Sequence, residues 1–294
     1  MYKGIITLQG GLGNQLFQYA LVRSLSQVNL KLYFDLSFLA KNNRTTNTFT
    51  SRNYELEIFE NLKAQPLPKI YQTFINSPSW IYILLSRFLL GKLSYLKYNS
   101  LKYEPISVNG SFYLEGYFQS EKYFKHIRSE LLQELAFPFH NCGLDEIIAD
   151  IKSKTHSVAL HVRRGDYLKP SVQNVHGILT TEYYKEAIDF ILSAVTNPYF
   201  FIFSDDEIWC ENTFRDWGIN YFIVTGNSGN NAWKDMYLMS ICKHHIIANS
   251  SFSWWGAWLS NCKNTIKIAP KQWYNPSNGP FPIEDIVPDN WILF

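Results

Sequence analysis

The sequence places two adjacent arginines in the stretch HVRRGDY, residues 161–167. Guanidinium groups carry permanent charge in a planar fork that suits phosphate oxygens. His161 lies two residues before Arg163, so in a strand both side chains point to the same side and can share one ligand. Asp166 can brace an arginine or act as a base. A structural ion pair beside a core histidine is the alternative, but the preceding apolar run favours anion binding by Arg163 and Arg164.

A second polar cluster, Asp205 and Asp206, follows the apolar run over residues 199–203. A carboxylate there can accept two hydrogen bonds from a guanine edge or a ribose diol. It can also cap the helix that follows, because aspartate is a preferred N-cap residue. The pattern leaves open which aspartate does which.

A third cluster reads NSSFSWWG over residues 249–256. Hydroxyl groups and free backbone N–H groups at the start of a helix form an anion site. Simple capping beside a packed tryptophan pair is the alternative. Because two other polar clusters also follow strands, the series favours phosphate binding here.

The N-terminal glycine cluster runs GGLGNQ over residues 10–15. It is not a dinucleotide fingerprint, because Leu16 replaces the third glycine, and it is not a P-loop, because the Lys-Ser/Thr ending is missing. The glycines instead indicate a turn where the backbone approaches a ligand closely.

Composition excludes several classes of protein. Of 294 residues, 46% are hydrophobic and 18% are charged, which excludes intrinsic disorder, and a net charge of +2 disfavours a nucleic-acid partner. The sequence has no D-x-D spacing and no zinc-type cluster, so we expect cationic side chains, without a metal, to neutralise any diphosphate. The dispersed cysteines are expected to be reduced thiols: Cys142, Cys210, Cys242 and Cys262.

Each polar cluster must be positioned by a strand. Short apolar runs alternate with helical segments, which predicts parallel sheets with right-handed crossovers and ligands beyond the carboxyl ends of the strands. Strands are expected over 4–8, 30–34, 112–114, 157–162, 199–203, 221–224, 245–248 and 265–269. Helices are expected over 14–25, 120–136, 181–194 and 235–242, and a further helix follows the polar residues 249–251 and runs through Trp258. A break near 140–155 predicts two Rossmann-like α/β domains, residues 1–150 and 151–294.

The sequence shows no secretory leader and no run of the roughly 18 apolar residues that a membrane span requires. We therefore expect a cytoplasmic protein. Residues 61–103 contain six basic and no acidic residues around an apolar centre, Trp80 to Leu90. This segment is either a buried helix pair with basic ends or a peripheral contact with the inner face of the cytoplasmic membrane.

Together these motifs resemble glycosyltransferase family 11, the α-1,2-fucosyltransferases. The matching stretches are residues 10–20, 114–124 (LEGYFQSEKYF), 161–167, 203–206 with Trp209, and 249–259. The resemblance implies a GT-B fold, with two Rossmann-like domains facing across a cleft. It also implies a bacterial enzyme of surface polysaccharide (O-antigen) synthesis. The donor would be GDP-β-L-fucose and the acceptor a terminal β-galactoside, on an oligosaccharide or a lipid-linked glycan, with inversion and without metal or other cofactor.

The resemblance also suggests roles for individual residues. Arg163 would stabilise the charge on the departing β-phosphate, and Asp166 is the candidate base, with Glu115, His176 or no base as alternatives. Donor contacts would come from His161, Arg164, Asp205, Asp206, Asn249, Ser250, Ser251, Phe252, Ser253, Asn14 and Gln15, and acceptor contacts from Glu115, Tyr117 and Gln119. Two rival functions remain: a GT-B transferase for another nucleotide sugar, and a carbohydrate-binding protein without catalysis.

Overall fold

The computed structural model describes residues 2–294 except 47–48, 70, 73–92, 99–101, 141, 276 and 278–281. The chain forms two compact units, residues 1–136 and 137–294. The sequence analysis expected the boundary after residue 150, whereas the units divide after residue 136. The difference arises because helix α6 (Asp145–Ser153) belongs to the second unit. Ile148 and Ile151 of α6 are buried there with Ala159 and Phe201.

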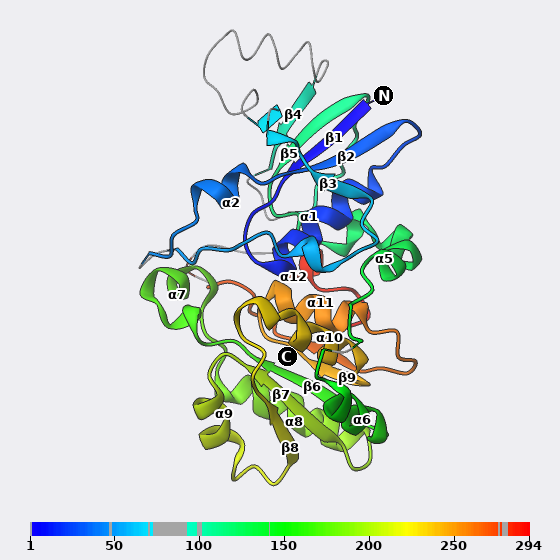
Figure 1. Ribbon diagram of the computed structural model, residues 1–294. Helices are drawn as coiled ribbons and strands as arrows, with labels where there is room; N and C mark the ends of the chain where they lie inside the picture. The colour runs from blue at the N-terminus through cyan, green and yellow to red at the C-terminus, as the bar shows by residue number, and fades with distance from the viewer. Residues whose placement is uncertain are drawn as a thin grey trace. The chain divides into compact units, whose positions relative to one another are not determined.

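The first unit is built on a parallel sheet with strand order β3-β2-β1-β5-β4 (Figure 1). Its elements are β1 (Tyr2–Thr7), α1 (Leu12–Ser24), β2 (Leu30–Asp35), α2 (Ser37–Lys41), β3 (Ala64–Pro66), β4 (Leu93–Lys97), β5 (Ser111–Glu115) and α5 (Arg128–Glu134), with 3-10 turns at Leu56–Ile58, Glu121–Tyr123 and Lys125–Ile127. The three strands and the first helix expected in this half are confirmed. The short edge strands β3 and β4 were not predicted.

The helix expected over 120–136 is wrong in extent. The chain makes two 3-10 turns before the seven residues of α5. Phe124 interrupts the helix with φ −140° and ψ 1°, and its fully buried ring packs on Phe17 at a centroid distance of 5.9 Å. The stabilisation gained by burying this aromatic ring is greater than the stabilisation lost by interrupting the helix at Phe124.

The second unit holds a six-stranded parallel sheet with order β11-β10-β9-β6-β7-β8. Its strands are β6 (Ser157–Val162), β7 (Tyr199–Ser204), β8 (Asn220–Val224), β9 (His244–Ile246), β10 (Lys267–Ala269) and β11 (Ile292–Leu293). Its helices besides α6 are α7 (Pro170–His176), α8 (Thr181–Ala194), α9 (Glu207–Phe214), α10 (Trp233–Ile241), α11 (Ser251–Leu259) and α12 (Ile283–Ile286). All five strands expected in this half are confirmed within a few residues.

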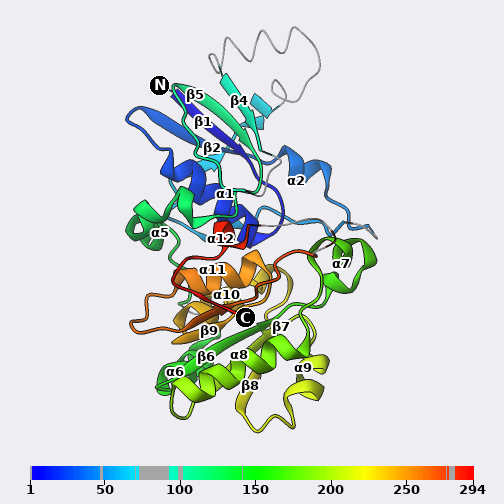
Figure 2. The ribbon, with the colours of Figure 1, turned by 180° about the vertical axis from the view of Figure 1, so that it is seen from behind.

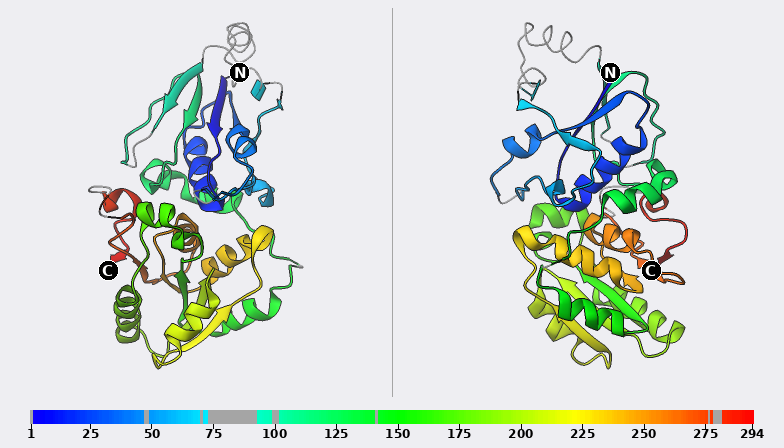
Figure 3. Two further views of the ribbon diagram at one scale, coloured as in Figure 1. Left: turned by 90° about the vertical axis from the view of Figure 1, so that its left-hand side faces the viewer. Right: turned by 45° about the vertical axis from the view of Figure 1, so that its right-hand side comes forward.

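Helices cover both faces of this second sheet. Alternate residues of β6 point to opposite sides: Leu160 packs with Ile188 of α8, whereas Ala159 packs with Leu238 of α10. Figure 2 shows α8 in front of the sheet, and Figure 3 shows each unit from two further directions. A parallel sheet covered on both faces is a Rossmann-like arrangement, in which ligands bind at the carboxyl ends of the strands.

Candidate active site

Arg163 lies at the carboxyl end of β6, a central strand of the second sheet. Its guanidinium is held between two carboxylates, with Nη2 2.6 Å from Asp166 Oδ1 and Nη1 2.9 Å from Asp205 Oδ2. Burial alone would lower the pKa of Arg163, but the charges of Asp205 and Asp166 outweigh it and raise that pKa. The group therefore stays a fixed cation, with N–H donors beyond the two that the carboxylates engage.

Arg164 is held on the other side of the same turn. Its Nε donates to Asp206 Oδ2 at 3.1 Å, and its guanidinium carbon lies 4.5 Å from the centre of the Trp209 ring. Asp206 Oδ1 accepts from Trp209 N, so Asp206 is the N-cap of α9. Asp205 Oδ1 accepts from the backbone N–H groups of Arg164 and Gly165, at 2.8 and 3.0 Å. The structure thus answers the question left open by the sequence: Asp206 caps, and Asp205 holds the arginine turn.

Gly165 makes this turn possible. A Cβ atom at this position would lie 2.6 Å from Asp205 Oδ2, closer than real side chains approach. Both aspartates engage arginines, so they position the turn. The expected contact of one of them with the donor stays a prediction. Asp166 likewise braces Arg163 in the described structure.

Three buried polar atoms in this region have no hydrogen-bond partner within the described part of the chain: His161 Nδ1, His176 Nδ1 and Asn249 Oδ1. Buried polar groups nearly always have a hydrogen-bond partner, so such atoms are candidates for ligand contact. Burial, together with the charge of Arg163, lowers the pKa of His161 to about 3, so this imidazole is neutral at physiological pH. His161 and Asn249 are also among the donor contacts expected from the sequence.

His176 stands in a ring stack beside Arg163. Its ring lies 4.9 Å from Tyr167 at an interplanar angle of 17° and 5.1 Å from Tyr274, and the Arg163 guanidinium carbon is 5.6 Å from the Tyr167 ring centre. Burial lowers the pKa of His176; Asp166 opposes that shift and Arg163 adds to it. A neutral imidazole can accept a proton, which keeps His176 as a candidate base.

The start of α11 is capped by its own serine. The Ser250 hydroxyl accepts from Phe252 N at 3.3 Å, while the fully buried Ser253 donates to the carbonyls of Ala248 and Ser250. Ser251 and Phe252 are half-buried at the first turn. Phosphate binding by this turn therefore stays a prediction for Ser251 and Phe252, whereas Ser253 has a role inside the turn.

In the first unit, Asn14 and Gln119 meet. Gln119 Nε2 donates to Asn14 Oδ1 at 2.7 Å, which joins one expected donor contact to one expected acceptor contact across 105 positions of sequence. The pair lies by the glycine turn at the carboxyl end of β1. Gly10 has φ +72°, and a Cβ there would lie 2.4 Å from Asn14 Nδ2, so only glycine fits.

Gln15 is different from its neighbour. It is fully buried, its Nε2 donates to the carbonyls of Gly10 and Asn53, and its Oε1 accepts from Glu55 N. The Glu55 carboxylate in turn accepts from Leu12 N at the start of α1. Gln15 therefore shapes the turn, and its expected role as a donor contact stays a prediction.

Glu115, at the end of β5, accepts hydrogen bonds from Lys97 and Tyr95, each on a different carboxylate oxygen. Burial acts to raise the pKa of Glu115, but these two donors outweigh it and lower that pKa. A carboxylate with a lowered pKa and both oxygens engaged is a poor proton acceptor. The structure therefore disfavours Glu115 as the base, while leaving it and the exposed Tyr117 available for an acceptor.

Asp235, in the first turn of α10, is a chemically distinctive residue that sequence reasoning missed. It accepts from Asn227 Nδ2 at 2.7 Å. Burial raises its pKa to about 7, although the Asn227 bond opposes the shift, and nearby Glu207 raises it further. The available signal was an acidic residue inside the apolar helical run WKDMYLMSI.

We expect Asp235 to make folding pH-dependent. A carboxyl group with a raised folded-state pKa binds more protons folded than unfolded, so stability falls as pH rises from about 4 to 7 and then levels off. Between pH 5 and pH 8, the free energy of unfolding should fall by about 2–3 kcal/mol more in the wild type than in Asp235→Asn. Urea unfolding at both pH values measures this, with the exposed Asp216→Asn as control. Equal pH dependence in wild type and Asp235→Asn would contradict it.

Among the described residues, no three His, Cys, Asp or Glu side chains are grouped so that they could hold a metal ion.

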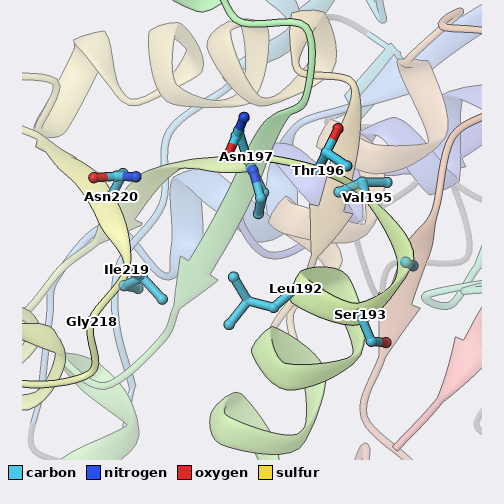
Figure 4. Close-up of a pocket in the computed structure, with 10 residues that line it drawn as sticks. Leu192, Ser193, Val195, Thr196, Asn197, Gly218, Ile219 and Asn220 are labelled. Carbon is cyan, nitrogen blue, oxygen red and sulfur yellow. The ribbon is translucent and has the colours of Figure 1, made fainter.

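No helix in that part of the chain is both long and apolar enough to cross a membrane. The apolar segment Trp80 to Leu90, for which the sequence predicts a buried helix pair or a membrane contact, lies outside the described residues. A cavity of about 440 Å³ lies at the amino ends of β7 and β8 (Figure 4). Its lining, residues 192–198 and 218–220, carries no charged side chain, and it lies away from Arg163.

Two Rossmann-like units, one of which carries braced arginines at the carboxyl end of a central strand, define a glycosyltransferase of the GT-B class. The fold agrees with solved structures. The α-1,6-fucosyltransferase NodZ, soaked with GDP-fucose, has a TM-score of 0.51 at 15% identity, covering 91% of this chain and 94% of NodZ. A mutant of Arabidopsis thaliana FUT1, in complex with GDP, has a TM-score of 0.52 at 13% identity, covering 94% of this chain and 72% of FUT1.

Sequence comparison identifies the family. The sequence model of glycosyl transferase family 11 matches residues 3–294, and this chain belongs to that family. An Escherichia coli α-1,2-colitosyltransferase is 34% identical, covering 98% of this chain and 97% of the relative. The E. coli O-antigen biosynthesis glycosyltransferase WbnK is 31% identical, covering 97% and 98%. Rat galactoside α-(1,2)-fucosyltransferase 1 is 27% identical, covering 87% and 63%. The family resemblance read from the motifs is confirmed.

Proposed function

We propose that this protein transfers L-fucose from GDP-β-L-fucose to the 2-hydroxyl of a terminal β-galactoside during O-antigen synthesis, with inversion and without a metal. The observation that carries the proposal is the pair Arg163 and Arg164, fixed by three carboxylates at the carboxyl end of β6. Neutral sugars need no such cations, whereas a departing nucleoside diphosphate does. This argues against the rival carbohydrate-binding protein.

The residues divide the work as follows. As the bond between the sugar and the β-phosphate breaks, negative charge grows on the phosphate, and Arg163 stabilises it without reorganising because Asp166 and Asp205 already hold it. Arg164 and the start of α11 bind the remaining phosphate oxygens. His161 and Asn249 supply neutral polar atoms to the donor. The proton of the attacking hydroxyl passes to His176, or to solvent after the leaving group has largely departed.

A second donor has a specific observation in its favour. The relative at 34% identity is named for colitose, which is fucose without its 3-hydroxyl group. A pocket that hydrogen-bonds this hydroxyl should reject GDP-colitose strongly, whereas an apolar pocket discriminates only weakly between the two sugars.

The test is an assay of the purified full chain with GDP-fucose, GDP-colitose and UDP-galactose against galactosides ending in Galβ1,3 or Galβ1,4. We expect GDP release and an α-1,2 linkage by NMR with GDP-fucose, unchanged by EDTA. Transfer from GDP-colitose alone would replace the fucose proposal with the colitose one. Transfer from UDP-galactose alone, or no transfer from any donor, would overturn both.

A further inference from the structure

The edge of the first sheet presents a set of side chains suited to a sugar ring. We propose that Tyr95, Lys97 and Glu115 form an acceptor subsite, which binds the neutral sugar next to the galactose that is modified. This inference rests on the proposed function, because it extends the expected acceptor contact at Glu115 to Tyr95 and Lys97. Nothing in the motifs pointed to Tyr95 or Lys97.

Tyr95 provides an aromatic platform. It lies on β4, which forms the edge of the five-stranded sheet, and it pairs in register with Tyr113 of β5. The two rings are stacked, with centroids 5.3 Å apart and planes 19° apart. Tyr113 is only 5% exposed, whereas Tyr95 is 57% exposed. One face of the Tyr95 ring is therefore supported by Tyr113, and the ring remains open to a ligand.

Glu115 and Lys97 supply polar groups beside that ring. They are paired in register two residues after the tyrosines, so all four side chains lie on one face of the sheet. Lys97 Nζ lies 2.5 Å from Glu115 Oε1, and the Tyr95 hydroxyl donates to Oε2. The side chains of Lys97 and Glu115 are 49% and 26% exposed. An ionised carboxylate accepts hydrogen bonds from sugar hydroxyls, and an ammonium group donates to them.

The chemistry favours a neutral sugar over an anion. The charge of Lys97 is balanced by Glu115, and an anionic ligand would meet the carboxylate as well as the ammonium. A pyranose instead presents C–H groups on one face, which pack on the electron-rich face of an aromatic ring, and hydroxyl groups around its rim. The Tyr95 ring suits the C–H face of the sugar, and Glu115 with Lys97 suits its hydroxyl groups.

The backbone holds this cluster in place. Tyr98 N donates to the Glu115 carbonyl at 2.8 Å, and the buried Gln18 donates to the Gly116 carbonyl at 2.9 Å. Gly116 has φ +156°, and a Cβ there would lie 2.8 Å from the Tyr98 carbonyl oxygen. From Glu115 the chain leads directly to Tyr117, 39% exposed, and then to Gln119, which binds Asn14. The cluster is thus joined through residues 116–118 to Gln119, one of the expected acceptor contacts.

The experiment compares a short with a long acceptor in Tyr95→Ala, using methyl β-galactoside and a galactose-terminated trisaccharide. We expect KM for the trisaccharide to rise about tenfold, because an aromatic contact of this kind corresponds to roughly three- to tenfold in affinity and its rim bonds are disturbed as well. KM for methyl β-galactoside and kcat for both should stay within about twofold. Tyr95→Phe keeps the platform and should raise KM less than about threefold.

Tyr2→Ala is the matched control, because Tyr2 is 53% exposed on the same sheet but at the amino end of β1. An unchanged trisaccharide KM in Tyr95→Ala would overturn the subsite. An equal rise in KM for both acceptors would also overturn the subsite, because it would mean that Tyr95 only stabilises the structure of β4. If the wild type transfers no sugar, the proposed function fails instead, and saturation-transfer NMR of trisaccharide binding to wild type and Tyr95→Ala tests the subsite separately.

Discussion

Arg163→Ala is expected to lower kcat for glycosyl transfer by about 10²–10³-fold, the loss typical of removing one preorganised donor from a site of developing negative charge. Arg163 is preorganised in this sense, because Asp166 and Asp205 hold both ends of its guanidinium at 2.6 and 2.9 Å. KM for the acceptor should change little, since the contact strengthens only as the phosphate departs. Steady-state kinetics with GDP release measures both parameters.

Two further variants make this prediction decisive. Arg163→Lys keeps the charge but cannot span both carboxylates, so it should recover only part of the lost rate. Arg215→Ala removes an exposed arginine of the same unit, which lies 3.6 Å from Glu211, and should leave kcat unchanged. Circular dichroism and thermal unfolding confirm that each variant is folded. A folded Arg163→Ala enzyme with wild-type kcat would remove the basis of the proposed mechanism.

The strand-end clusters could be read from sequence because each follows a short apolar run with a clear ending. The run over residues 157–162 is buried on both faces, so it stands out without any alternation, and the arginines after it had to lie at the carboxyl edge. The same logic placed Asp205, Asp206 and Asn249 at that edge. Parallel pairing then brought β6, β7 and β9 side by side.

The sequence could not predict which partner each polar side chain binds. Asp205 and Asp206 are identical neighbours with different roles. Asp205 binds the backbone N–H groups of Arg164 and Gly165, whereas Asp206 caps α9. The backbone path at Gly165 decides this difference. Gln15 and Asn14 are also adjacent, but helical geometry points Gln15 inward, onto Asn53 and Glu55. Contacts across about 40 positions, like these, have no local signal.

Tyr95 was missed for a related reason. A short edge strand with exposed residues has no apolar pattern, and β4 is recognisable only through its register with β5. The value of Tyr95 depends on Tyr113 behind it and Glu115 beside it, and both belong to another strand. Acceptor contacts are therefore harder to predict than donor contacts, because they arise from pairing between strands and not from a motif.

The two aspartates that hold Arg163 should differ in their effect on kcat, with a loss of about 10²-fold for Asp205→Asn and less than about tenfold for Asp166→Asn. Asp205 Oδ1 accepts two backbone N–H groups while Oδ2 binds Arg163, so it sets both the turn and the guanidinium. Asparagine would present an N–H₂ group to Arg163 or to those amides. Hydrogen bonds to charged groups contribute about 1.5–3 kcal/mol, which corresponds to roughly 10–10²-fold in rate if the loss is felt fully in the transition state.

The variant Asp166→Asn distinguishes two roles of Asp166, namely positioning Arg163 and acting as the general base. A general base contributes about 10²–10⁴-fold, and its removal abolishes the limb of the pH–rate profile that reports its ionisation. A brace acts through Arg163, so its removal should lower kcat/KM by the same small factor at every pH from 6 to 9. Asp189→Asn, an exposed aspartate paired with Lys185 at 3.6 Å, serves as the control. A loss greater than 10²-fold together with a missing pH limb would make Asp166 the base. His176, with its neutral and unpartnered Nδ1, would then have no part in the proton transfer.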